Sequence, residues 1–454
     1  MDIKNLHKIY FLGIGGIGMS ALARYFNSRN IDVHGYDKTP SPLTQKLSEE
    51  GMTIHYKDNP NKIPDNIDMV IYTPAIPNSL LEFQAIKNRK TPLFKRAEIL
   101  GMISKEHFTI AIAGTHGKTS VTSLVAHLLN HAGKNVSAFI GGIAKNFNSN
   151  CIISKNTEIV VVEADEYDRS FLKISPDIAV ITSMDADHLD IYDNKNALED
   201  TFNEFLDNIR PNGTAIVLDQ LPAVTKSNIN FLEYGYNTKT AFSVTTKGYH
   251  NGIHILDYLL QEELLKEVSF PLPGRYNALN SLVASAIAKL LHIPNEKIIS
   301  GLKTFKGVER RFDYRYKHAT ITYIDDYAHH PNEIKSCIEA VKNLYPNKTI
   351  TGIFQPHLFT RTRDFADEFA TSLSMLDEVI LLPIYPAREE AIPGITSKFL
   401  LDKISIKKKS LLEKDEIIKK VSTLKTDILL TLGAGDIDRL IKPIEQLLKT
   451  KYND

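Results

Sequence analysis

Residues 108–120 read FTIAIAGTHGKTS, an apolar run followed by a loop that contains two glycines and a lysine. The apolar run, Phe108–Ala113, predicts a buried strand, and a helical run, Val121–His131, follows the loop. In such a strand–loop–helix unit, backbone N–H groups of the loop surround phosphates, the lysine reaches the terminal phosphates, and the next hydroxyl reaches Mg²⁺. The stretch therefore predicts a nucleotide-binding loop around Lys118.

The loop is a shortened form of the general phosphate-binding motif. That motif has a glycine five positions before Gly117, and Ile112 stands there instead. A surface Gly-Lys turn is the alternative interpretation, but the strand before the loop and the helix after it favour phosphate binding. The residues of the predicted phosphate loop are Gly114, Thr115, His116, Gly117, Lys118, Thr119 and Ser120.

Composition and charge narrow the class of protein. The chain has 454 residues, which predicts two to four domains, and its hydrophobic fraction of 43% and charged fraction of 24% are typical of folded proteins. Lys plus Arg and Asp plus Glu both number 54, so the net charge is zero. Because no basic excess is present for a nucleic acid, we expect no nucleic-acid partner.

The cysteines and the apolar runs of the sequence indicate the cellular compartment of the protein. The two cysteines, Cys151 and Cys337, stand far apart, which argues against a disulfide framework and fits a reducing compartment. The start, MDIKNLHKIYFLGIGGIG, lacks the features of a signal peptide. No apolar run approaches the roughly 18–20 residues of a membrane span. We therefore expect a cytoplasmic protein without membrane insertion.

Three segments each show the strand–helix alternation of parallel α/β domains. The pattern breaks near Glu98–Glu106, and a third segment begins near Gly307. We predict three domains, over residues 1–104, 105–305 and 306–454. The expected strands are Lys8–Leu12, Asp32–Tyr36, Met69–Tyr72, Phe108–Ala113, Glu158–Val162, Asp177–Thr182, Thr320–Ile324, Ile350–Phe354, Glu378–Leu382 and Asp427–Leu432.

A second glycine-rich loop lies in the first segment. GIGGIG at residues 13–18 follows a strand and opens a helix, and Asp37 stands at the end of the next strand. Such glycines let the backbone approach a pyrophosphate, and the acid suits a ribose hydroxyl. A tight turn is the alternative. The loop alone would suggest an NAD dehydrogenase, but only ATP-driven chemistry on a nucleotide-linked substrate uses both this loop and the lysine loop.

Further motifs follow the lysine loop along the chain. They are Glu163-Ala-Asp165-Glu166, Asp187-His188, Gly274-Arg275-Tyr276-Asn277-Ala-Leu-Asn280, Arg310-Arg311-Phe312, Asp325-Asp326-Tyr327-Ala328-His329-His330-Pro331, Gln355-Pro356-His357, Thr360-Arg361-Thr362-Arg363 and YPAREEAIPG at Tyr385–Gly394. In order and spacing, this series resembles the Mur ligase family, ATP-dependent enzymes that build the peptidoglycan peptide. The resemblance covers nearly the whole chain.

The resemblance implies a fold and a reaction. The expected fold is α/β with an N-terminal Rossmann-like UDP-binding domain, a central P-loop ATPase-type domain and a C-terminal Rossmann-like domain that binds the amino acid. The expected reaction joins L-alanine to UDP-N-acetylmuramate through an acyl phosphate, with ATP and Mg²⁺, in a monomer or homodimer. Addition of a murein tripeptide in cell-wall recycling is one alternative. A nucleotide-dependent regulatory protein without ligase activity is another.

The resemblance also implies roles for individual residues. The expected catalytic residues are Lys118, Glu163, His188 and Arg311. ATP is expected to contact the phosphate loop together with Asn277, Asn280, Arg311 and Asp326. The expected UDP-substrate site comprises Gly13, Gly15, Gly16, Gly18, Asp37, Thr73 and His116. The expected amino-acid site comprises Tyr327, His329 and Arg361, and the expected metal ligands are Thr119, Glu163 and His188.

Several of these positions have ordinary alternatives. Glu163 alone would be a solvated acid at a strand end, His188 a surface histidine, and Asn277 a helix N-cap. Two departures from the family pattern are present: Tyr276 replaces the usual histidine, and Leu358 stands where alanine-adding members often have arginine. The residue that contacts adenine beside the asparagines, and the residue that binds the amino-acid carboxylate, are therefore not determined by the resemblance.

Overall fold

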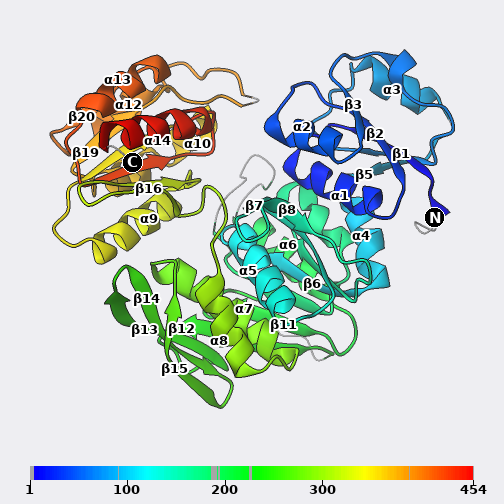
Figure 1. Cartoon of the computed structure of the whole chain (residues 1–454), viewed down its shortest axis with the longest axis horizontal. Helices are drawn as coiled ribbons and strands as arrows, with labels where there is room; N and C mark the ends of the chain where they lie inside the picture. Colours follow the sequence, from blue (N-terminus) through cyan, green and yellow to red (C-terminus); the bar gives the residue numbers. More distant parts are fainter. Residues whose placement is uncertain are drawn as a thin grey trace. The chain divides into compact units, whose positions relative to one another are not determined.

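The computed structural model describes residues 5–89, 91–185, 192, 195–223, 228–387 and 389–452, and Figure 1 shows its helices and strands. The strands form three sheets, of five, ten and six strands. The chain divides into two compact units. One comprises Met1–Thr245, Leu256–Ser269 and Leu279–Lys306, and the other comprises Thr246–Ile255, Phe270–Ala278 and Gly307–Asp454.

The five-stranded sheet is parallel and has the strand order β3-β2-β1-β4-β5. The order reverses beside β1, and ligands of open α/β sheets bind outside the carboxyl ends of strands at such a point. The elements of this part are β1 (Lys8–Leu12), α1 (Ile17–Asn27), β2 (Asp32–Tyr36), α2 (Pro42–Glu49), β3 (Thr53–His55), η2 (Pro60–Lys62), β4 (Met69–Tyr72), α3 (Leu81–Asn88), β5 (Leu93–Lys95) and α4 (Arg96–Glu106).

The ten-stranded sheet has the order β15-β14-β13-β12-β11-β10-β6-β9-β7-β8. Strand β6 lies inside it, between β10 and β9, and runs parallel to both. The elements are β6 (Phe108–Ala113), α5 (Lys118–His131), β7 (Val136–Ala144), β8 (Ser149–Ile152), β9 (Ile159–Glu163), η3 (Tyr167–Lys173), β10 (Ile178–Ile181), α6 (Lys195–Asp207), β11 (Thr214–Leu218), β12 (Asn230–Tyr236), β13 (Phe242–His250), β14 (Ile253–Leu260), β15 (Glu263–Phe270), α7 (Arg275–Leu290) and α8 (Asn295–Thr304).

The six-stranded sheet has the order β16-β17-β21-β18-β19-β20. Only β16 pairs antiparallel to its neighbour among these described strands. The elements are β16 (Asp313–Lys317), β17 (Thr322–Asp326), α9 (Pro331–Leu344), β18 (Ile350–Phe354), α10 (Phe359–Asp364), α11 (Ala366–Leu373), β19 (Glu378–Leu381), α12 (Ser397–Lys403), β20 (Lys409–Leu411), η4 (Lys414–Glu416), α13 (Ile417–Thr423), β21 (Ile428–Leu432) and α14 (Asp438–Tyr452).

Burial on both faces explains why the central strands have uninterrupted apolar sequences. In β1, Ile9 and Phe11 belong to one buried cluster, while Tyr10 and Leu12 belong to another. Because successive side chains of a strand point to opposite faces, both faces of a parallel sheet covered by helices must be apolar. The structure thus confirms the predicted α/β fold class. Among the described residues, no helix is both long enough and apolar enough to cross a membrane.

A buried histidine in the second unit gives a pH prediction. His254 of β14 is fully buried, bonds Thr246 at 2.9 Å between Nε2 and Oγ1, and stacks on Tyr249. Burial lowers the pKa of His254 to about 4. The unfolded chain therefore binds a proton that the folded chain excludes, so stability is lost as the pH falls from about 6.5 to 4, by about 3 kcal/mol.

Histidine-selective NMR titration would measure this pKa directly. His254→Gln would identify the resonance by removing it, and His250→Gln, at an exposed position of β13, is the matched control. We expect one described histidine to stay neutral down to about pH 4. A pKa of about 6.5 at His254 would contradict the expected burial effect.

Candidate active site

The phosphate loop connects the carboxyl end of β6 to α5. Gly114 and Gly117 have φ values of +131° and +85°, which favour glycine. A Cβ on Gly114 would lie 2.2 Å from Thr182 Oγ1, so the close packing of the loop against the end of β10 also requires glycine. The Thr182 hydroxyl contacts the carbonyl oxygens of Ala113 and His116. The loop is therefore fixed by the neighbouring strand.

A second set of contacts fixes the first residues of the loop. The Ser183 hydroxyl oxygen accepts a hydrogen bond from the His116 N–H at 2.8 Å and lies 2.9 Å from the Thr115 hydroxyl. His116 Nε2 lies 3.2 Å from a carboxylate oxygen of Asp185, which is half-exposed, whereas the His116 ring is buried. These contacts place His116 between the loop and the segment that follows β10.

The Lys118 ammonium lies inside the loop and is held by a buried acid. It donates to Gly114 O at 2.6 Å and to the two carboxylate oxygens of Glu166 at 3.0 and 2.8 Å. Glu166 is fully buried. Burial alone lowers the pKa of Lys118, but the carboxylates of Glu166, Asp165 and Glu163 outweigh burial, so its pKa is raised. Lys118 therefore remains a cation, and its hydrogen bonds to Glu166 and Gly114 O hold the ammonium inside the loop.

Two oxygen ligands suitable for a divalent cation meet beside this lysine. The Thr119 hydroxyl donates to Glu163 Oε2 at 3.2 Å, and Gly141 N–H donates to Glu163 Oε1 at 2.6 Å. Glu163 is the last residue of β9, so its carboxylate stands at the carboxyl edge of the sheet. A Cβ on Gly141 would lie 2.4 Å from Glu163 Oε2, so glycine is needed for this approach. The hydroxyl–carboxylate pair fits the hard oxygen donors that Mg²⁺ prefers.

The two asparagines of the adenine prediction share helix α7 but make different contacts. Asn280 Oδ1 lies 3.0 Å from the position of a Cβ on Gly117, so it faces the phosphate loop. Asn277 Nδ2 donates to Pro273 O at 2.8 Å. Asn277 is inside the helix, which begins at Arg275, so its role is not that of an N-cap. Tyr276 beside it is exposed.

The glycine loop of the first sheet is closely packed by side chains. Gly15 N–H donates to Asp37 Oδ2 at 2.8 Å, and a Cβ on Gly15 would approach the same oxygen to 2.8 Å. A Cβ on Gly13 would lie 2.7 Å from Thr73 Cγ2. A Cβ on Gly18 would lie 2.5 Å from Arg96 Nη1. The structure thus brings Asp37 and Thr73 to this loop and adds an arginine that the sequence analysis missed.

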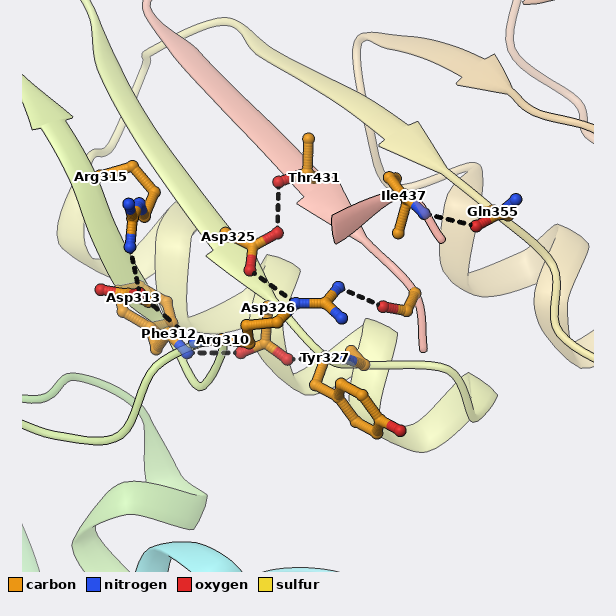
Figure 2. Close-up of polar contacts among 12 residues, drawn as sticks. Arg310, Phe312, Asp313, Arg315, Asp325, Asp326, Tyr327, Gln355, Thr431 and Ile437 are labelled. Carbon is orange, nitrogen blue, oxygen red and sulfur yellow. Dashed lines mark hydrogen bonds and ion pairs between the residues drawn. The ribbon is translucent and has the colours of Figure 1, made fainter. Parts of the chain in front are cut away.

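The two C-terminal residues predicted near ATP are Arg311 and Asp326, and Figure 2 shows Asp326 with its neighbours Arg310 and Phe312. Asp326 ends β17, and its carboxylate accepts the N–H groups of Phe312 at 2.7 Å and Ala328 at 2.8 Å. Burial raises the pKa of Asp326 to about 6, although the Arg311 cation opposes this. The Arg311 guanidinium carbon lies 4.8 Å from the Tyr327 ring centroid. The Asp326 carboxylate therefore holds the backbone N–H of Phe312, the residue that follows Arg311.

Ring contacts link most of the predicted amino-acid site. Tyr327 and His329 have centroids 5.2 Å apart, and His329 and His357 have centroids 6.1 Å apart. His357 stacks on Tyr385 at 5.7 Å. His329 Nδ1 lies 3.0 Å from Tyr327 O. The DDYAHHP, QPH and YPA motifs therefore meet at the carboxyl end of this sheet.

Arg361, the third predicted residue of that site, is buried in α10. The helix begins beside Leu358, whose φ of +68° is unfavourable for leucine, and whose N–H donates to Tyr385 O at 3.0 Å. The first two N–H groups of α10 bond to Glu389 Oε2, at 2.6 and 3.0 Å. The position of α10 is thus set by the YPAREEAIPG segment, which sequence spacing alone did not indicate.

Asp187 and His188 lie outside the described residues, so the proposed histidine ligand stays a prediction. Sequence analysis did not assign Glu166 or Arg310, both of which make strong side-chain contacts at the candidate sites. Their positions inside the EADE and RRF motifs were the available signal, but their partners stand 48 and 15 residues away.

Comparison with known proteins gives matches over the whole chain. Three family models match: the Mur ligase family catalytic domain over residues 8–108, the Mur ligase middle domain over residues 112–288 and the Mur ligase glutamate ligase domain over residues 310–435. The curated UDP-N-acetylmuramate–L-alanine ligase of Flavobacterium psychrophilum is 46% identical over 455 aligned residues, which cover 99% of this chain and 100% of that protein.

Solved structures agree with these matches. The crystal structure of a UDP-N-acetylmuramate–alanine ligase from Thermotoga maritima has a TM-score of 0.83 and 28% identity, and the match covers 98% of this chain and 99% of that one. A murein peptide ligase from Psychrobacter arcticus has a TM-score of 0.70 and 21% identity, over 99% of both chains. At 21% identity, the similarity to the murein peptide ligase shows a shared fold and no more.

Proposed function

Because this chain belongs to the Mur ligase family, we propose that it joins the amine of L-alanine to the lactyl carboxylate of UDP-N-acetylmuramate and cleaves ATP to ADP and phosphate. The observation that carries the choice of substrates is the full-length similarity, at 46% identity, to an enzyme named for this reaction. The geometry supports the chemistry, because a half-buried lysine and a hydroxyl–carboxylate pair meet beside one glycine loop.

ATP is proposed to bind with its phosphates in the loop 114–120. The Lys118 ammonium would leave part of its contact with Glu166 and neutralise charge on the transferring phosphoryl group. Asn280 faces the same loop, so its amide is placed to contact the nucleotide. Asn277 is proposed to contact adenine, and Arg311 is proposed to act on the γ-phosphate.

Magnesium is proposed to bind at Thr119 and Glu163, with His188 for a second ion. The Thr119 and Glu163 oxygens lie 3.2 Å apart, which is close enough for both to coordinate one cation. When bound, the ion would supply charge neutralisation at the phosphate oxygens. Glu163 is held in place for this role by the Gly141 N–H.

The substrates are proposed to use the other two sheets. UDP would bind at the glycine loop of residues 13–18, with Asp37 and Thr73 beside it and His116 toward the muramyl carboxylate. L-alanine would bind near Tyr327 and His329, with Arg361 pairing with its carboxylate. Because Leu358 stands where alanine-adding family members often have arginine, this pairing is proposed to rest on Arg361 or Arg363.

The proposed reaction has two steps. The lactyl carboxylate oxygen attacks the γ-phosphorus, the bond to ADP breaks, and an acyl phosphate forms. The alanine amine then attacks the acyl carbon, loses a proton, and phosphate leaves with the carboxylate oxygen. A carboxylate is a poor acyl donor, so phosphorylation activates it, and exclusion of water protects the acyl phosphate from hydrolysis. Positioning and electrostatics carry the catalysis.

The experiment compares amine donors. Mg²⁺-dependent phosphate release from ATP would be measured with UDP-N-acetylmuramate and either L-alanine or the L-Ala-D-Glu-diamino-acid tripeptide. We expect release with L-alanine. Release only with the tripeptide would favour the recycling reaction, whose candidate relative matches in fold at 21% identity. No release with either amine, from folded protein, would overturn the ligase proposal.

A further inference from the structure

The backbone on both sides of Arg311 has an unfavourable conformation. Arg310 has φ of +63° and Phe312 has φ of +44°, a region that disfavours residues with a side chain. Neither position is a glycine, so neighbouring contacts must hold this conformation. Such strain at two residues that flank a functional candidate indicates that the direction of Arg311 is imposed by the surrounding structure.

Arg310 is held by a network of buried polar groups, drawn in Figure 2. Its Nε donates to Asp325 Oδ2 at 3.1 Å, and its Nη2 donates to Gly433 O at 2.6 Å. Asp325 is fully buried, and its other oxygen accepts from the Thr431 hydroxyl at 2.6 Å. The Thr431 oxygen in turn lies 3.0 Å from the Tyr323 hydroxyl. Both carboxylate oxygens of Asp325 are thus satisfied, and Arg310 is tied to β17 and to the end of β21.

Asp326 and Tyr327 hold the other side of the same loop. Phe312 N–H donates to Asp326 Oδ2 at 2.7 Å, and Tyr327 N–H donates to Arg310 O at 2.6 Å. The end of β17 therefore holds Arg310 through its side chain and carbonyl, and Phe312 through its N–H, as Figure 2 shows. Arg311 is the residue between these two anchors.

The two adjacent arginines have different surroundings. Among the residues that the structure describes, the Arg311 guanidinium donates no hydrogen bond and forms no ion pair. It faces the Tyr327 ring, 4.8 Å from its centroid, and its charge opposes the rise in the pKa of Asp326. The Arg310 guanidinium is committed to Asp325 and Gly433. The Arg311 guanidinium thus keeps its N–H donors for an anion, whereas Nε and Nη2 of Arg310 already donate within the protein.

We propose that Arg310 and Asp325 form a positioning pair that holds Arg311 in the direction required for phosphoryl transfer. This inference rests on the proposed function, in which Arg311 acts on the transferring phosphoryl group. Neither residue touches a substrate in this scheme. Asp325 and Asp326 therefore have separate tasks, because the first fixes the Arg310 side chain and the second fixes the backbone beyond Arg311.

Two variants of the full-length chain break the pair. Arg310→Gly removes the guanidinium while glycine accepts the positive φ, and Asp325→Asn keeps the shape of the side chain but removes its charge. If Arg310→Gly does not fold, Asp325→Asn carries the test. The matched control is Asp427→Asn. Asp427 directly precedes β21 and forms an ion pair with Lys348, so this pair lies at the opposite end of the strand from Gly433. Folding would be checked by circular dichroism.

A double-mutant cycle separates positioning from general stabilisation. Amide formation would be measured for both variants in the wild-type and Arg311→Ala backgrounds. We expect kcat to fall by up to about 10²-fold in the wild-type background with a smaller change in the KM for ATP, and to stay unchanged in the Arg311→Ala background. Asp427→Asn should keep the wild-type kcat.

The outcomes distinguish this inference from the proposed function. An equal loss of kcat in both backgrounds, or wild-type kcat in Arg310→Gly and Asp325→Asn, would overturn the positioning role while leaving the ligase proposal intact. Wild-type kcat in Arg311→Ala would also overturn it. A folded wild-type chain that forms no amide would overturn the proposed function and this inference together.

Discussion

Lys118→Met should lose at least about 10²-fold in kcat for amide formation, which is the largest single effect expected in this chain. The Lys118 ammonium is the cation inside the phosphate loop, within 3.0 Å of Gly114 O and both Glu166 oxygens. Methionine fills similar space but brings no charge and no donor. The variant also leaves the fully buried Glu166 carboxylate without this partner, so some loss of stability should accompany the loss of activity.

The assay for this variant is phosphate release and product formation at saturating ATP. Lys134→Met is the matched control, because Lys134 is an exposed lysine just after α5, the helix that Lys118 begins. The control should keep the wild-type kcat. Circular dichroism would confirm that Lys118→Met is folded at the assay temperature. Wild-type turnover in folded Lys118→Met would show that the loop does not carry the chemistry.

Glu163→Gln should raise the Mg²⁺ concentration for half-maximal activity by about 10- to 100-fold or more. The amide keeps the size of the side chain and can still accept the Gly141 N–H, but it removes the negative charge beside Thr119. Because Mg²⁺ prefers charged oxygen ligands, affinity for the ion should fall more than the fold is disturbed. High Mg²⁺ should restore part of the activity.

The matching control for this prediction lies next to the same strand. Glu158 is exposed and directly precedes β9, whose last residue is Glu163. Glu158→Gln should leave the Mg²⁺ dependence unchanged. An unchanged Mg²⁺ requirement in Glu163→Gln would place the cation elsewhere.

Local sequence pattern was sufficient for the scaffold of the site. The apolar run of β6, the glycines after it and the helical run of α5 are neighbours in sequence, so their arrangement follows from short-range physics. The same holds for β1, β2 and β4 of the first sheet. Helix α4 was not expected, because Gly101 and Ser104 are buried along with the apolar residues Ile99, Leu100 and Ile103. Its sequence therefore does not separate into one apolar and one polar face.

Long-range side-chain pairs could not be predicted in this way. Glu166 stood among several acids, and only the fold shows that its carboxylate, rather than that of Asp165, holds Lys118. The left-handed conformation at Arg310 has no glycine to indicate it. The Arg310 side chain bonds Asp325 and Gly433, which come from two neighbouring strand ends. Such contacts depend on sheet order, which motif spacing does not contain.

The most direct test of the account is an isotope transfer measurement. UDP-N-acetylmuramate with ¹⁸O in both oxygens of its lactyl carboxylate would be incubated with the wild-type chain, MgATP and L-alanine, and the phosphate and amide products analysed by mass spectrometry. The account predicts that each phosphate released carries one ¹⁸O and each amide formed retains the other, with no transfer in Lys118→Met. Amide formation with unlabelled phosphate would contradict the acyl-phosphate route, and phosphate release without amide would contradict the ligase.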